Sequence, residues 1–423
     1  MISFIKAIRQ LTLVHWVALT LCLLVSAAVL NPINRADMLA AGVHKANDLL
    51  AYRAAVLLAQ TGDSPYDMAG MERYQTPPFV SYYIYPPPAL LFFIPFAQGG
   101  DELATALAHD VNVVLLALLI TGVGAFIACL SGSLLCAAIA VLLLLKSQAV
   151  LSALLCGQVT GLIGLGTLMF LWGLRGQHNG LLAVGAVLAG VFKVTPGVIA
   201  LLLLLRRYRG ALVWLVVFTL ALCGLTWLIF PHDIWGQWLL TVAQKGYGQQ
   251  VVAQPRWPLG EPYNMGLNAA VSRLLSPTPH YWPVPPILAP DLVKPLTYAA
   301  SLLIFALALW ISYVARAVPL VGAALLLWCS FILSPLCWIY NFLFAVPAAA
   351  YFMALWWRRR QWLPLVFMLG GFVAIDEFGF MLARSPVWAC LPFAVYLVVG
   401  ALFMRSGYVC GREAADTATA ASA

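Results

Sequence analysis

The sequence predicts an all-α polytopic membrane protein, a bundle of about 10–12 transmembrane helices with short interfacial helices in two outer loops. Three observations support this prediction. Of the 423 residues, 63% are hydrophobic and only 9% are charged, whereas soluble domains carry about 25% charged residues. The apolar residues form bilayer-length runs, and the basic residues cluster at the ends of these runs. The formal net charge of +8 therefore indicates membrane topology, and no basic face interleaved with aromatic residues suggests nucleic acid as a partner.

The first span follows Lys6 and Arg9 and runs from Leu11 to Leu30. It is longer than the about 7–15 residues of a secretory h-region, so we expect an uncleaved span with its N-terminus inside. Further spans are predicted, in order, at Leu103–Leu130, Leu134–Leu151, Val159–Leu174, Ala211–Phe230, Leu296–Ala315, Leu320–Leu336, Ile339–Trp357, Trp362–Phe380 and Val387–Met404.

The run Leu181–Leu205 differs from the others because Lys193 and Pro196 interrupt it. As a single helix it would place the cluster beginning at Arg206 on the opposite side of the membrane from Arg175. A proline breaks or kinks a helix, and a hairpin of two short helices would return both ends to the cytoplasmic side. We therefore expect a re-entrant hairpin with Lys193 at its outward tip.

These spans predict one membrane domain over residues 1–410, with outer loops at about 31–88 and 231–295, and a disordered cytoplasmic tail at 411–423. All nine cysteines lie in or beside apolar runs, so we expect neither a disulfide framework nor a cysteine metal site. No HExxH or HxxxH pattern predicts a zinc site. Nucleotide-binding fingerprints and αβ-alternating segments are also missing, so no cofactor is expected and any donor should arrive through the membrane.

The first outer loop carries helical periodicity from about Ala46 to Gln60, typical of an amphipathic helix on the membrane surface. Asp48 and Tyr52 fall on one face of it, one turn apart. A carboxylate at membrane level is a candidate functional group, and Asp48 is the candidate general base. His44 precedes Asp48 by four residues and could tune or replace it, although a surface histidine is the commoner situation.

Other polar residues are predicted at the same outer face. Lys193 would bind the phosphate of a lipid donor or, alternatively, extend to the interface. Arg273 could bind phosphate oxygens through its forked guanidinium. Further candidates for substrate contact flank the spans or lie in the loops, and for the aromatic ones interfacial anchoring is the alternative: Tyr52, Tyr85, Gln158, Asn264, Asn268 and Trp338.

In their order along the chain, these motifs resemble the polyprenol-phosphate-sugar-dependent enzymes of glycosyltransferase family 87, which includes α-1,2-mannosyltransferases of phosphatidylinositol mannoside synthesis. The resemblance runs from Asn47 to Tyr340 and rests on Asp48 with Tyr52, Gly62-Asp63-Ser64-Pro65-Tyr66, Tyr85-Pro86-Pro87, Gly157-Gln158, Lys193 with Pro196, Asn264 to Arg273, and Ser334-Pro335 with Trp338.

The resemblance implies a GT-C fold, an active site at the outer face, inverting transfer and a catalytic acid at the position of Asp48. Two departures are expected to alter acceptor contacts. The chain reads Asn264-Met265-Gly266 where the family often shows Asn-Gln-Ser, and Tyr340-Asn341 where it often shows His-His.

The sequence thus predicts a membrane hexosyltransferase with its active site on the periplasmic side. It would move mannose or another hexose from a polyprenyl-phosphate donor to a lipid or glycan acceptor, with membrane lipids around it. The alternative is a flippase for a lipid-linked sugar. Such transporters are typically built from inverted repeats with broken helices in matching halves, whereas this sequence has one broken segment and no convincing repeat.

Overall fold

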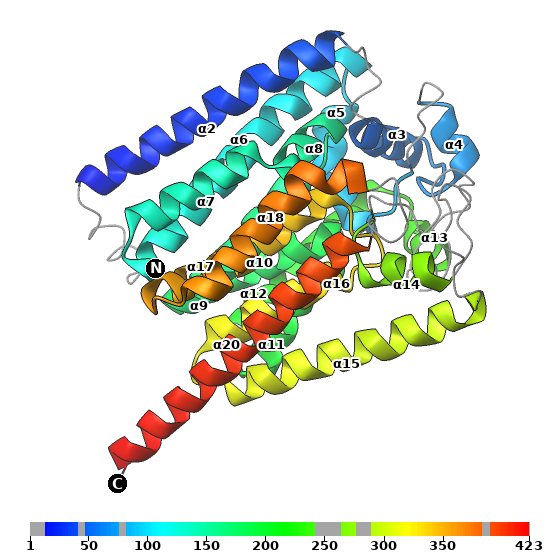
Figure 1. Cartoon of the computed structure of the whole chain (residues 1–423). Helices are drawn as coiled ribbons and strands as arrows, with labels where there is room; N and C mark the ends of the chain where they lie inside the picture. Colours follow the sequence, from blue (N-terminus) through cyan, green and yellow to red (C-terminus); the bar gives the residue numbers. More distant parts are fainter. Residues whose placement is uncertain are drawn as a thin grey trace.

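The computed structural model describes residues 13–40, 47–75, 82–241, 264–275, 289–382 and 390–422. Within these ranges most residues are helical and no β-strand forms, apart from an isolated antiparallel bridge between Asn264 and Trp338. The predicted all-α class is therefore confirmed. Long helices run side by side as a bundle, and the short helices α3, α4, α13 and α14 gather at one end of it (Figure 1).

The helices follow one another in this order: α2 (Leu13–Ala40), α3 (Asn47–Gln60), α4 (Met68–Glu72), α5 (Leu90–Ala97), α6 (Asp101–Ser131), α7 (Leu134–Lys146), α8 (Gln148–Cys156), α9 (Thr160–Gly176), α10 (Asn179–Phe192), α11 (Ala200–Leu205), α12 (Arg209–Ile229), α13 (Ile234–Thr241), α14 (Leu267–Leu275), α15 (Val293–Val314), α16 (Pro319–Ile332), α17 (Phe342–Arg358), α18 (Trp362–Leu382) and α20 (Leu391–Ser422). Single 3-10 turns precede several of them: η2 (Pro87–Ala89), η3 (Pro196–Ile199), η5 (Pro290–Leu292) and η6 (Ile339–Asn341).

Five described helices are long and apolar enough to cross a membrane, and a sixth span results if α7 and α8 are taken together. The axes of α7 and α8 differ by 44°, whereas the sequence predicted one continuous span over Leu134–Leu151. The bend lies at Ser147, whose hydroxyl accepts a hydrogen bond from the amide of Val150 and so begins a new helix. The predicted spans Leu11–Leu30, Leu320–Leu336 and Trp362–Phe380 correspond to apolar stretches of 10–17 residues in α2, α16 and α18, and the two arms of the predicted hairpin do so as well.

The centre of the bundle is formed by α16 and α17, which are buried on nearly all sides. By contrast, α12 is exposed along most of its length, and so is much of α15, as expected of helices that face lipid. Glycines allow close approach between α9 and α10, where a Cβ on Gly185 would lie 2.6 Å from the carbonyl oxygen of Gly166.

The segment around Lys193 reverses direction, in agreement with the expected hairpin. After α10 the chain turns through η3 so closely that a Cβ on Gly197 would lie 2.9 Å from the Cα of Gly190. At the other end of the segment, Gly210 lies against the amide of Asn179 at the start of α10. Both ends of the hairpin therefore meet at one end of the bundle.

Two elements differ from the sequence-based expectation. Helix α3 forms as predicted, but Leu49, Tyr52, Ala55 and Leu58 are all buried, so it is packed into the fold and does not lie on its surface. Its apolar residues surround the helix, and such a helix is buried on all sides. The tail expected to be disordered instead continues α20 to Ser422, in keeping with the high helix propensity of its alanines.

Candidate functional site

A cavity opens at the end of the bundle where the short helices gather. It has about 430 Å³ of empty space and is lined by Asp48, Tyr52, Tyr82, Ile84, Tyr85, Gln158, Lys193, Leu336, Trp338 and Tyr340. These residues come from α3, the segment before η2, the turn after α8, the hairpin tip, and the segment between α16 and α17. Five parts of the chain that are distant in sequence therefore meet here.

Asp48 lies in the first turn of α3, where the positive end of the helix dipole favours a carboxylate. Its Oδ2 accepts a hydrogen bond from Nε2 of Gln158. The other end of that amide, Oε1, accepts from the hydroxyls of Tyr52 at 3.2 Å and Tyr85 at 3.3 Å. Because both phenols point at Oε1, the amide must present its NH₂ group to Asp48. Gln158 therefore holds the carboxylate in one orientation.

The geometry of the turn after α8 brings Gln158 to Asp48. Gly157 ends α8 in the left-handed conformation, with φ of 67°, which glycine adopts without steric cost. A Cβ on Gly157 would lie 2.8 Å from the Cβ of Leu49, so the missing side chain also lets the turn pack directly on α3. Gly157 thus lets the turn approach α3 closely, and the side-chain amide of Gln158 then reaches Asp48.

The two phenols of this network lie in an aromatic cluster. Tyr52 stacks on Phe93 with ring centroids 4.3 Å apart, and the hydroxyl of Tyr66 donates to the backbone oxygen of Tyr85 at 3.0 Å. Burial raises the pKa of both Tyr52 and Tyr85, and the charge of Asp48 raises each further. Both hydroxyls therefore stay protonated and act as hydrogen-bond donors.

Lys193 reaches the same cavity from the hairpin tip. Its Nζ donates to Oδ1 of Asn341 at 2.6 Å and lies 6.0 Å from the ring centroid of Tyr340. Asn341 in turn donates to the backbone oxygen of Leu336 at 2.7 Å, which fixes the orientation of its amide. Because Asn341 is neutral, this contact orients Lys193 without cancelling its charge. Among the described residues that line the cavity, Asp48 is the only acid and Lys193 the only base.

Three predicted substrate-binding residues lie elsewhere. Arg273 is only 2% exposed and donates to the backbone oxygen of Asn264 at 2.9 Å. The Asn264 side chain accepts from the amide of Cys337 at 2.9 Å and donates to the oxygen of Pro335 at 3.1 Å. Asn268 is 1% exposed and does not line the cavity. Arg273 of α14 therefore holds Asn264, and Asn264, which precedes α14, holds the segment around Cys337. The buried side-chain amide of Asn268 has no hydrogen-bond partner among the described residues.

His44 lies outside the described residues. Four residues that line the cavity were not singled out from the sequence as binding residues: Tyr82, Ile84, Leu336 and Tyr340. The tyrosines before η2 fitted an interfacial belt equally well, and Tyr340 stood out only as a departure from the family pattern. In the part of the chain that the structure describes, no three His, Cys, Asp or Glu side chains gather as a metal site.

Comparison with known proteins gives one match. The sequence model for glycosyltransferase family 87 matches residues 83–338, which is more than half of the chain. The matched range contains Tyr85, Gln158, Lys193 and Trp338, whereas Asp48 precedes it. No curated protein and no solved structure matches.

Proposed function

Since the chain belongs to glycosyltransferase family 87 and is thus a membrane glycosyltransferase, we propose that it transfers a hexose from a polyprenyl-phosphate donor to an acceptor hydroxyl on a lipid or glycan. The observation that carries this proposal is the shared cavity of Asp48 and Lys193. A carboxylate and an ammonium group on one cavity suit a reaction in which a proton leaves one oxygen while negative charge grows on another.

The proposed reaction is a single displacement. Asp48 takes the proton of the acceptor hydroxyl, and the acceptor oxygen forms a bond to the anomeric carbon. The bond from that carbon to the phosphate oxygen breaks on the opposite face, so the configuration inverts. Its electron pair leaves with the phosphate, which Lys193 stabilises. Such general-base assistance contributes typically about 10²–10⁴-fold, and electrostatic support of the leaving group adds to it.

The cavity also limits the size of what it binds. Its empty space of about 430 Å³ includes space that is open to the surroundings, so the enclosed part is smaller. That space suits one sugar ring with its phosphate. Trp338, Tyr82 and Tyr340 line the wall and offer aromatic faces against which a sugar ring packs.

The distribution of arginines supports a site on the extracytoplasmic side. Arg206 donates to the backbone oxygens of Ser312 and Arg316 at the end of α15, so these arginines share one end of the bundle. That end is opposite the hairpin tip, which carries Lys193 into the cavity. Because basic residues favour the cytoplasmic side, the cavity would then face outward.

The test is transfer from a radiolabelled polyprenyl-phosphate sugar in membranes containing Asp48→Asn. We expect transfer to fall by about 10²-fold or more, with the protein still inserted and folded. Asp63→Asn is the matched control, because Asp63 is exposed and pairs with Arg73 at 2.8 Å away from the cavity. Transfer near the wild-type rate in Asp48→Asn would rule out Asp48 as the base. Movement of intact donor across the membrane, without release of polyprenyl phosphate, would instead indicate a flippase.

A further inference from the structure

A second, larger cavity lies along the side of the bundle. It is a groove with about 1060 Å³ of empty space, partly open to the surroundings, between α7 and α18. Its floor is α17, which contributes Val346, Ala349 and Ala350 between the larger Phe342 and Met353. Small floor residues leave room that the neighbouring side chains do not fill, whereas protein interiors are normally close-packed. The groove therefore has the form of a site that a flexible apolar ligand fills.

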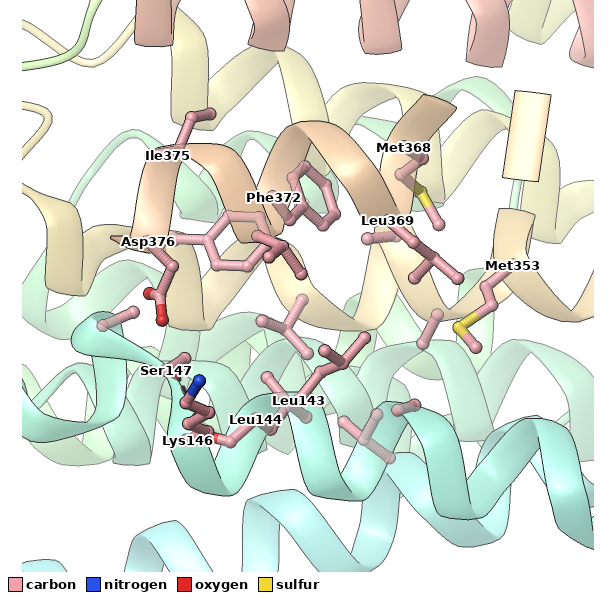
Figure 2. A pocket seen from close by; sticks show the side chains of 18 of the residues that line it. Leu143, Leu144, Lys146, Ser147, Met353, Met368, Leu369, Phe372, Ile375 and Asp376 are labelled. Carbon is pink, nitrogen blue, oxygen red and sulfur yellow. Dashed lines mark hydrogen bonds between the residues drawn. The ribbon is translucent and has the colours of Figure 1, made fainter. Parts of the chain in front are cut away.

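The groove has a polar end and an apolar end (Figure 2). Lys146, Ser147 and Asp376 lie at one end, and Met353 and Met368 lie at the other. Asp376 accepts a hydrogen bond from the amide of Gln148 at 2.6 Å and so caps the start of α8. Between Ile339 and Met353 the chain advances by about 21 Å at 1.5 Å per helical residue. The lining of the groove thus extends over roughly 21 Å along η6 and α17.

The groove shares two walls with the catalytic cavity. In the turn η6, Ile339 lines the groove while the next residue, Tyr340, lines the cavity. Asn341, the third residue of η6, holds Lys193. Helix α8 begins at the groove and leads to Gln158 in the cavity. One short turn therefore separates the groove from the proposed phosphate site.

We propose that this groove binds the isoprenoid chain of the donor lipid. This assignment rests on the proposed function, which places the phosphate of that lipid at Lys193. The turn η6 borders both spaces, so a chain whose phosphate lies at Lys193 reaches the groove across one turn. Small residues on its floor, such as Ala350, give space to the methyl branches of an isoprenoid. Because lipid surrounds the protein, the isoprenoid chain would be bound through close packing in the groove and not through removal of apolar surface from water.

The first experiment compares donors that differ only in chain length. Wild type should show a KM for a long-chain polyprenyl-phosphate sugar about tenfold lower than for a two-isoprene analogue, through the summed dispersion contacts of the bound chain. Ala350→Trp fills the groove and should raise the long-chain KM to the short-chain value, while kcat/KM for the short-chain donor is kept. Ala306→Trp on the exposed side of α15 is the matched control. An unchanged long-chain preference in Ala350→Trp overturns the proposal.

A second experiment needs no groove variant and therefore does not depend on its folding. Wild-type protein in nanodiscs is photolabelled with a polyprenyl phosphate whose extended chain is about as long as the groove and carries a diazirine on its terminal isoprene, and the labelled peptides are sequenced. We expect labels on Met353 or Met368, competed by unlabelled polyprenyl phosphate and not by excess phosphatidylglycerol. Labels confined to exposed α12, or equal competition by the phospholipid, overturn the assignment. The proposed function fails in a different way: wild-type protein would then transfer sugar from no polyprenyl-phosphate donor, whatever its chain length. In that case the labelling result alone would test whether the groove binds an isoprenoid chain.

Discussion

Replacing Gln158 by leucine tests whether the orientation of Asp48 limits the reaction. The change keeps a branched side chain of similar size but removes the donor to Asp48 and the acceptor for two phenols. A hydrogen bond to a charged group contributes about 1.5–3 kcal/mol. If that stabilisation is realised in the transition state, kcat should fall by roughly 10- to 150-fold, at about 1.4 kcal/mol per factor of ten.

The expected kinetic signature separates this role from substrate binding. Because Gln158 contacts the base, Gln158→Leu should lower kcat while the donor KM changes little. Stability should change modestly, since Tyr52 and Tyr85 remain within 3.0 Å of one another and can hydrogen bond together. The assay is initial-rate transfer from labelled polyprenyl-phosphate sugar in nanodiscs over a range of donor concentrations, with thermal unfolding measured on the same samples.

A matched control exists elsewhere in the chain. Gln237 in α13 donates to Asp233 at 2.5 Å, the same pairing of residue types outside the cavity, and Gln237→Leu should leave kcat unchanged. The conservative variant Gln158→Glu places a second carboxyl beside Asp48, and two carboxyls sharing a site hold a proton more tightly. The acidic limb of its pH–rate profile should therefore move to higher pH. A wild-type kcat in Gln158→Leu would refute the positioning role.

Three further predictions follow from the same geometry. Lys193→Ala should raise the donor KM by roughly 10- to 150-fold, through loss of about 1.5–3 kcal/mol of charge-assisted bonding, and an unchanged KM in donor titrations would contradict its phosphate role. Arg273→Ala should lower the melting temperature by removing a buried hydrogen bond, and the folded fraction should keep the wild-type donor KM. Burial raises the pKa of Tyr85, so its phenol stays protonated as the pH rises to about 10; Tyr85→Phe should cost a few-fold in kcat without changing the alkaline limb of the pH profile.

Much of the fold could be predicted because the length of an apolar run and the charges at its ends identify a membrane span without reference to the rest of the chain. The hairpin at Lys193 followed from the arginines on either side of it together with Pro196. The break at Ser147 was missed, although the polar triplet Lys146-Ser147-Gln148 interrupts the apolar run, because such a triplet does not by itself show whether a helix ends there or continues. The burial of α3 was also missed, since its apolar residues have partners only after the distant turn at Gly157 packs against it.

The candidate site was predicted in part for a similar reason. Asp48 and Lys193 were singled out because charges in apolar surroundings are costly, and the structure places both on one cavity. Arg273 has the same chemistry but is used for a backbone contact with Asn264. Helical spacing shows which residues share a face, whereas only the packed structure shows what that face meets.

Because the amide of Asn341 that orients Lys193 is neutral, the charge of the cavity during turnover is set by Lys193, Asp48 and the donor phosphate. In the proposed reaction, the donor phosphate is a singly charged diester, and the departing polyprenyl phosphate becomes doubly charged as Asp48 turns neutral. The summed charge of the cavity thus stays constant through bond exchange, which spares a low-dielectric space the cost of creating new net charge. When the proton later escapes to water, the restored carboxylate repels the phosphate beside it. Proton loss and lipid departure would then be coupled, and release should accelerate as the medium becomes more alkaline.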